Sequence, residues 1–102
     1  MSVIDHRTLP ILTMRPGIKG QFLAHKDVGA TGVSLLRNTV DPGVSAPLHK
    51  HTVEETMVVL EGLVWVQVGE ERTTLGPHHT VIIPAETPHA WGNAGTQEAT
   101  LL

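Results

Sequence analysis

Two histidines and two glutamates occur within the seven residues HKHTVEE, from position 49 to position 55. Imidazole nitrogens and carboxylate oxygens are ligands that divalent transition-metal ions accept. Residues i and i+2 of a strand point to the same face, so the side chains of His49 and His51 are expected side by side. The chain then turns and can bring the carboxylate of Glu54 or Glu55 back toward them. The stretch therefore predicts part of a metal site, with a solvated polar turn as the alternative.

A complete site needs a ligand from elsewhere in the chain, and His89 in the segment IIPAETPHAWGN is the candidate. It follows a proline-bounded turn, where a new strand is expected to begin. Two or three imidazoles and one carboxylate suit one divalent ion of Fe, Mn, Ni, Cu, Co or Zn. The chain has no cysteine and no tyrosine, which excludes thiolate clusters, disulfides, nucleophilic thiols and catalytic phenols.

The elements that must position these residues are predicted to be strands. Val, Thr and Ile make up 29 of the 102 residues, and β-branched side chains favour the pleated conformation. Ten glycines and seven prolines cut the chain into short pieces of strand length. The predicted strands are 18–25, 33–40, 45–51, 55–61, 63–69, 71–75, 79–83, 89–93 and 97–102. Many short strands without a helical period predict an all-β sandwich or barrel.

The length of the chain limits it to one domain. We expect residues 18–102 to form a β-barrel domain and residues 1–17 to form an N-terminal arm that packs on the barrel or on a dimer partner. The net charge is −3 and the basic residues are scattered, which argues against nucleic acid as a partner. No apolar run is long enough to span a membrane and no signal-peptide pattern begins the chain, so a soluble, cytoplasmic protein is expected.

The spacing around the histidines resembles the first conserved motif of the cupin superfamily. The matching residues are Gly43-x5-His49-x-His51-x3-Glu55-x6-Gly62. The gap to the second glycine selects Glu55, and not Glu54, as the ligand. The resemblance covers roughly residues 33–102 and implies a small single-domain metal-binding cupin, whose fold is a double-stranded β-helix, or jelly roll.

The second cupin motif is matched in part. Pro84, His89 and Asn93 fall in the register of that motif, whereas His78 and Glu86 stand where glycine is usual. The departures put the loop shape across residues 76–88 in question without removing a ligand. The resemblance thus implies one divalent ion held by His49, His51, Glu55 and His89, and it gives Asn93 a structural role.

Three large side chains are candidates for the wall of a substrate pocket. Met57 shares a strand face with Glu55, and Trp91 shares one with His89. Trp65 is the third candidate. Packing in the core is the alternative explanation for each of them.

Arg37 and Gln67 are polar residues within apolar strand sequences. If Arg37 faced inward, its planar guanidinium could bind a substrate carboxylate. If it faced outward, it would only increase solubility. Both residues are kept as pocket candidates.

Four protein ligands would leave about two positions of an octahedral ion open for substrate or dioxygen. We therefore expect an enzyme that acts on a small oxygenated organic molecule. Dioxygenase-type oxidoreduction is slightly favoured over isomerase, lyase or decarboxylase chemistry. The alternative is a non-catalytic module that binds or senses a small ligand or the metal. Because Val58 and Leu60 would expose an apolar outer sheet face, a homodimer is also expected.

Overall fold

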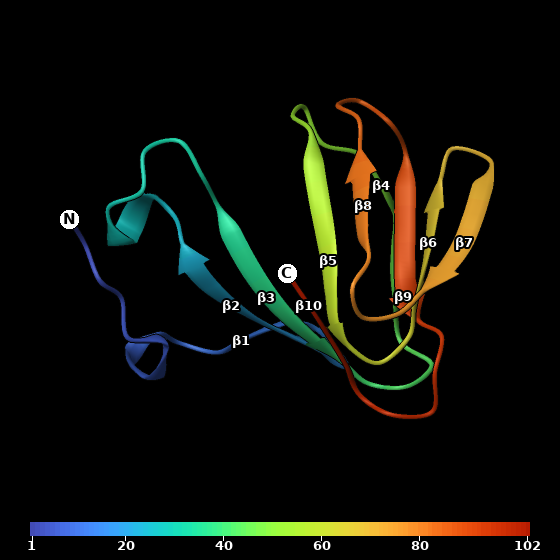
Figure 1. Ribbon diagram of the computed structural model, residues 1–102, viewed down its shortest axis with the longest axis horizontal. Helices are drawn as coiled ribbons and strands as arrows, with labels where there is room; N and C mark the ends of the chain where they lie inside the picture. The colour runs from blue at the N-terminus through green and yellow to red at the C-terminus, as the bar shows by residue number, and fades with distance from the viewer.

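The computed structural model describes all 102 residues as a β-structure with almost no helix. The strands are β1 (Leu12–Arg15), β2 (Ile18–Ala24), β3 (Leu35–Val40), β4 (Ser45–His49), β5 (Glu55–Glu61), β6 (Val64–Val68), β7 (Glu71–Leu75), β8 (Thr80–Ile83), β9 (His89–Asn93) and β10 (Ala99–Leu101). One sheet has the order β1-β2-β3-β10-β5-β8 and the other has the order β4-β9-β6-β7 (Figure 1). Every strand pair is antiparallel. The predicted all-β jelly roll is confirmed.

The nine predicted strands are all present, and their ends shift by two residues at most. The tenth strand, β1, was not predicted. All four of its residues are exposed, so burial imposes no alternation of apolar and polar residues on its sequence. The strand conformation of β1 instead comes from its antiparallel pairing with β2.

The core lies between the two sheets, and the burial of β5 alternates along the strand. On β5, Met57 and Val59 are buried, whereas Val58 and Leu60 face outward. The same alternation on the other strands completes a cluster of eleven buried apolar residues. Burial of such apolar surface is the main source of stability in a domain of this size.

The turn between β5 and β6 depends on Gly62. Its φ of +83° lies in the left-handed region, which residues with a Cβ rarely adopt. A Cβ at this position would also lie 3.0 Å from the Cα of Ala99. Glycine is therefore required here for its conformation and for its size.

Asn93 connects β9 to the neighbouring segments. Its buried side-chain amide donates to the carbonyls of Val40, at 3.0 Å, and Gln97, at 2.7 Å. Its Oδ1 accepts from the backbone N–H of Gly95 at 2.8 Å. These three bonds give Asn93 a structural position at the end of the strand that begins with His89.

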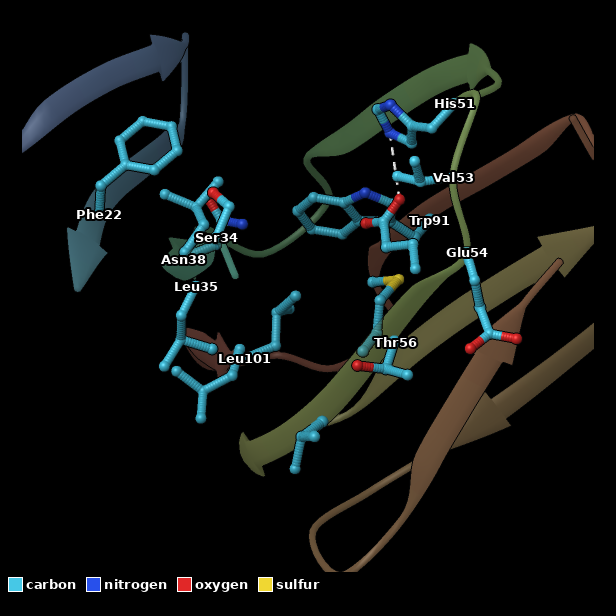
Figure 2. A pocket seen from close by; sticks show the side chains of 15 residues that line it. Phe22, Ser34, Leu35, Asn38, His51, Val53, Glu54, Thr56, Trp91 and Leu101 are labelled. Carbon is cyan, nitrogen blue, oxygen red and sulfur yellow. Dashed lines mark ion pairs between the residues drawn. The ribbon is translucent and has the colours of Figure 1, made fainter. Parts of the chain in front are cut away.

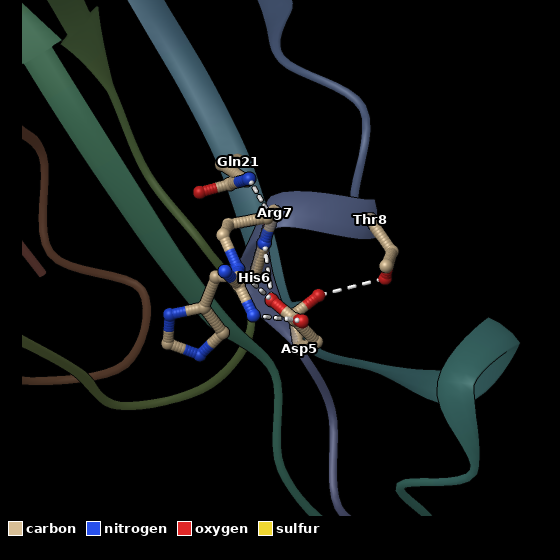
Figure 3. Close-up of polar contacts among 5 residues, drawn as sticks. All are labelled: Asp5, His6, Arg7, Thr8 and Gln21. Carbon is tan, nitrogen blue, oxygen red and sulfur yellow. Dashed lines mark hydrogen bonds and ion pairs between the residues drawn. The ribbon is translucent and has the colours of Figure 1, made fainter.

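The N-terminal segment contains the short 3-10 helix η1 (His6–Thr8). Asp5 caps it by accepting from the backbone and the side chain of Arg7, and this pairing lowers the pKa of the Asp5 carboxyl. Gln21 on β2 donates to the carbonyl of His6 at 2.6 Å (Figure 3). The segment is thereby attached to the sheet of its own chain.

The second 3-10 helix, η2 (Lys26–Val28), follows β2. Neither helix has the length or hydropathy that crossing a membrane requires.

The sheet order leaves an opening between β3 and β5. The strand between them, β10, is only three residues long and pairs with the C-terminal ends of both neighbours. Beyond β10, the strands β3 and β5 diverge (Figure 1). A cavity lies at this opening, next to the start of β5.

Candidate metal centre

Four residues from three parts of the chain meet at one mouth of the jelly roll. His49 ends β4, His51 lies in the loop that follows, Glu55 begins β5 and His89 begins β9. His49 and His89 are opposite each other in the β4–β9 pair, and Glu55 approaches from the other sheet. One potential ligand atom from each residue lies within 4.8 Å of all the others. The structure thus brings together the residues predicted to form a metal site.

The carboxylate of Glu55 is the centre of the group. Its Oε2 lies 3.1 Å from Nε2 of His51 and 3.3 Å from Nε2 of His89. The imidazole rings of His49 and His89 have centroids only 4.2 Å apart. Glu54 points away from His51 (Figure 2). The geometry therefore selects the same glutamate as the sequence spacing.

Backbone carbonyls fix the tautomers of two of the imidazoles. Nδ1 of His49 lies 2.6 Å from the carbonyl of Pro47, and Nδ1 of His89 lies 2.9 Å from the carbonyl of Thr87. A carbonyl can only accept, so each Nδ1 carries the hydrogen and donates it. The Nε2 atoms are left with free lone pairs, as in metal-ligating histidines whose other nitrogen is held by a carbonyl.

Two atoms of the cluster have no hydrogen-bond partner although they are buried. These atoms are Oε2 of Glu55 and Nε2 of His89. With the tautomer set by Thr87, both are acceptors that face each other across 3.3 Å. Buried polar atoms are nearly always paired, and two acceptors can share only a proton or a cation. The donor set and its orientation thus fit a divalent cation.

Two residues of the segment that precedes His89 adopt the left-handed backbone conformation. His78 and Glu86, which stand where glycine is usual, have φ angles of +72° and +60°. This conformation favours glycine, and at each of these two residues it lowers the stability of the fold by about 1 kcal/mol. The backbone N–H of Glu86 donates to the carbonyl of His51 at 2.7 Å, so this unusual conformation supports the loop of a candidate ligand.

A cavity of about 540 Å³ adjoins the four residues, and its lining includes His51 and Glu55. Met57 and Trp91 also line it, and Figure 2 shows Trp91 in its wall. Alternation explains both positions: they share the inward faces of β5 and β9 with Glu55 and His89.

The other three pocket candidates lie outside this cavity, because the same alternation turns them outward. Trp65 and Gln67 alternate on β6 with inward-facing valines, and the guanidinium of Arg72 lies 3.8 Å from the centre of the Trp65 ring. Arg37 is exposed on β3 and borders a separate hollow of about 190 Å³ together with Lys19. Trp65, Gln67 and Arg37 therefore do not line this cavity.

Sequence reasoning missed Asn38 and Phe22, which both line the cavity. Asn38 is 9% exposed, and its side chain makes no hydrogen bond within the protein. Its position between Leu36 and Val40 on the inward face of β3 was the available signal. The neighbouring Arg37 carries a charge and drew attention to the outward face instead.

Comparison with known proteins agrees with this architecture. Residues 36–102 match the family model described as Cupin domain, so the chain belongs to the cupin family. No curated protein sequence matches the chain.

Three similar solved structures illustrate the range of the fold. The polyketide cyclase RemF from Streptomyces resistomycificus is 22% identical, with a TM-score of 0.86 over 99% of this chain and 75% of RemF. KdgF from Halomonas sp. is 20% identical, with a TM-score of 0.81 over 99% of this chain and 88% of KdgF. The CENP-C cupin domain of Drosophila melanogaster is 20% identical, with a TM-score of 0.81 over 98% of this chain and 77% of that domain. At these identities the likeness shows the fold alone.

Proposed function

We propose that the chain is a metal-dependent cupin enzyme that acts on a small oxygenated organic molecule. The ion would be one divalent Fe, Mn, Co, Ni, Cu or Zn, held by His49, His51, Glu55 and His89. The observation that carries the proposal is the pair of buried polar atoms, Oε2 of Glu55 and Nε2 of His89, which lie 3.3 Å apart without a hydrogen-bond partner. These atoms adjoin a cavity large enough for a small molecule.

A bound ion would supply Lewis acidity or, for a redox metal, a site for dioxygen beside the substrate. The chain itself orients the imidazoles through the carbonyls of Pro47 and Thr87. Met57 and Trp91 exclude water from the adjoining wall, because both are buried and line the cavity.

The lining of the cavity favours dioxygenase-type oxidoreduction over isomerase, lyase or decarboxylase chemistry. Among the lining residues, only His51, Glu54 and Glu55 carry ionisable side chains. His51 and Glu55 belong to the candidate metal site, and Glu54 points away from His51 (Figure 2). Isomerase, lyase and decarboxylase reactions commonly need a protein acid or base besides the metal ligands, and the cavity lining does not supply one. Oxidation at a metal ion needs fewer such groups.

Metal content tests the proposal first. Untagged protein should contain about one equivalent of a transition metal by plasma mass spectrometry, and His51→Ala should contain almost none. Lys50→Ala is the matched control, because the neighbouring Lys50 is exposed and pairs with Glu86 instead of the cluster. Oxygen uptake with β-diketones, catechols and flavonols would then test the reaction. Parent protein that stays metal-free after reconstitution would refute the metal-dependent mechanism.

The second candidate is a module that binds a small ligand without converting it. The lining of the cavity favours this function, because a cavity without a free acid or base can hold a molecule and leave it unchanged. Saturable ligand binding with one equivalent of metal, but with no product and no oxygen uptake, would decide for this function.

We further propose that two copies pair through the outer face of the six-stranded sheet. Val58, Leu60 and Ile82 face outward there, and Leu60 and Ile82 are large exposed apolar residues. An exposed apolar face of this kind commonly marks an interface. Light scattering after size exclusion should give the mass of a dimer, and Leu60→Lys combined with Ile82→Lys should give a monomer. A parent protein that elutes as a monomer at micromolar concentration would refute the pairing.

A further inference from the structure

The cavity beside the cluster has more acidic than basic side chains in its lining. None of its lining residues is a lysine or an arginine, and two of them, Glu54 and Glu55, are carboxylates. The nearest lysine in the sequence, Lys50, pairs with Glu86 at 3.3 Å. Arg37 and Lys19 border the separate hollow on the outer face. A carboxylate or phosphate placed in this cavity away from the ion would have no cationic partner.

Most of the cavity wall is apolar. Nine of the fifteen lining residues are hydrophobic, and Phe22 and Trp91 contribute aromatic rings (Figure 2). The volume of about 540 Å³ lies within the range of pockets that bury a small aromatic molecule. Aromatic side chains prefer to pack against apolar and aromatic partners.

Asn38 contributes a polar side chain at the end of the cavity away from the cluster. Asn38 lies across the cavity from His51, near Ser34 (Figure 2). Its side chain is nine-tenths buried, lines the cavity and makes no hydrogen bond to the protein. A ligand group that forms a hydrogen bond with this amide would gain about 1 kcal/mol of affinity.

We propose that the cavity selects uncharged aromatic molecules with oxygen atoms at one end, next to the cluster, and a hydroxyl or carbonyl group at the other, next to Asn38. A hydroxyl would donate to Oδ1 of Asn38, and a carbonyl would accept from its Nδ2. A carboxylate at that end is rejected. The oxygen-bearing end rests on the proposed metal function, whereas the apolar wall and Asn38 do not depend on it.

Three related probes test the selection in metal-free and zinc-loaded protein: benzoylacetone, its para-hydroxy derivative and its para-carboxylate derivative. Isothermal titration calorimetry gives their affinities. We expect the para-hydroxy compound to bind about fivefold more tightly than benzoylacetone through one added hydrogen bond. We expect the carboxylate to bind about a hundredfold more weakly than benzoylacetone, because its charge would be buried without a partner.

Variants locate the binding. Asn38→Leu should abolish the advantage of the hydroxyl while leaving the affinity for benzoylacetone unchanged, and Arg37→Gln, on the outer face of the same strand, should change neither. The chain has two tryptophans, so Trp65→Phe assigns the indole N–H signal of Trp91 in nuclear magnetic resonance spectra. That signal should shift on binding.

Each result has a definite meaning. A carboxylate that binds as tightly as benzoylacetone would overturn the selection, as would a hydroxyl advantage that survives Asn38→Leu. The comparison of the three probes on parent protein needs no variant, so it stands even if Asn38→Leu does not fold. Binding of benzoylacetone to metal-free protein, with no zinc uptake, would support the apolar cavity and refute only the metal function.

Discussion

Replacing His89 with methionine should make the metal-free protein more stable and make it insensitive to metal. In the parent, Nε2 of His89 and Oε2 of Glu55 are buried acceptors 3.3 Å apart with no hydrogen-bond partner. Removing one such atom recovers about 2 kcal/mol, and losing the bond to the Thr87 carbonyl costs about 1 kcal/mol. The net gain of about 1 kcal/mol corresponds to a rise of about 4 °C in Tm for a domain of this size. Methionine suits the site because it is similar in volume and adapts to irregular spaces.

Metal should reverse the order of stability. An ion present at a hundred times its Kd would stabilise the parent by about 2.7 kcal/mol, which is a rise of about 10 °C. His89→Met should gain almost nothing. Differential scanning calorimetry with and without Zn²⁺ gives all four values, and His6→Met, an exposed position in the N-terminal segment, controls for the loss of a histidine. The reasoning fails if metal-free His89→Met melts several degrees below the parent, or if zinc raises both proteins equally.

Three further predictions concern the frame around the site, each measured as a free energy of unfolding in urea unless stated otherwise. Asn93→Ala should cost about 3 kcal/mol, because three hydrogen bonds are lost; a cost below 1 kcal/mol would contradict its structural role. Gly62→Ala should cost about 2 to 3 kcal/mol, because the residue has a left-handed φ and the added Cβ would contact Ala99. Gly69→Ala should cost only about 1 kcal/mol, because its φ is also left-handed, at +59°, but no atom lies within 4 Å of the added Cβ. Equal costs would show that the contact is relieved. Gln21→Ala should release the N-terminal segment and speed its cleavage by trypsin without changing the rest of the fold, because the Gln21 side chain donates to the backbone of that segment; unchanged cleavage would show that other contacts hold it.

The sequence predicted the strands well because each sheet buries one face and exposes the other. Alternation of the kind seen at Met57 and Val59 places every second side chain in the core, so the pattern follows from the packing. The same rule placed Met57 and Trp91 in the cavity. The unpredicted strand β1 is exposed throughout and therefore leaves no pattern.

The site could be predicted through its spacing, and the misses have physical causes. His51 lies beyond the end of β4, yet its ring centroid is 5.0 Å from that of His49, so the expected side-by-side placement occurs without a continuous strand. Arg37 was named as a pocket candidate because of its charge, although alternation turns it outward. Asn38, which alternation turns inward, was not named because attention went to the charged neighbour. The opening between β3 and β5 arises from where β10 ends relative to its neighbours, which no local pattern encodes.

The position of His51 has a consequence for the kinetics of metal exchange. The other three candidate ligands belong to strands whose ladders hold them, whereas His51 lies in a loop, where its carbonyl accepts one bond from the N–H of Glu86. An ion leaves a four-ligand site one bond at a time, and the first bond to break belongs to the ligand on the least constrained backbone. We therefore expect His51 to be the candidate ligand that moves most easily away from the site. The hydrogen bond from the backbone of Glu86 would then affect how long a bound ion stays, although Glu86 is not one of the four candidate ligands.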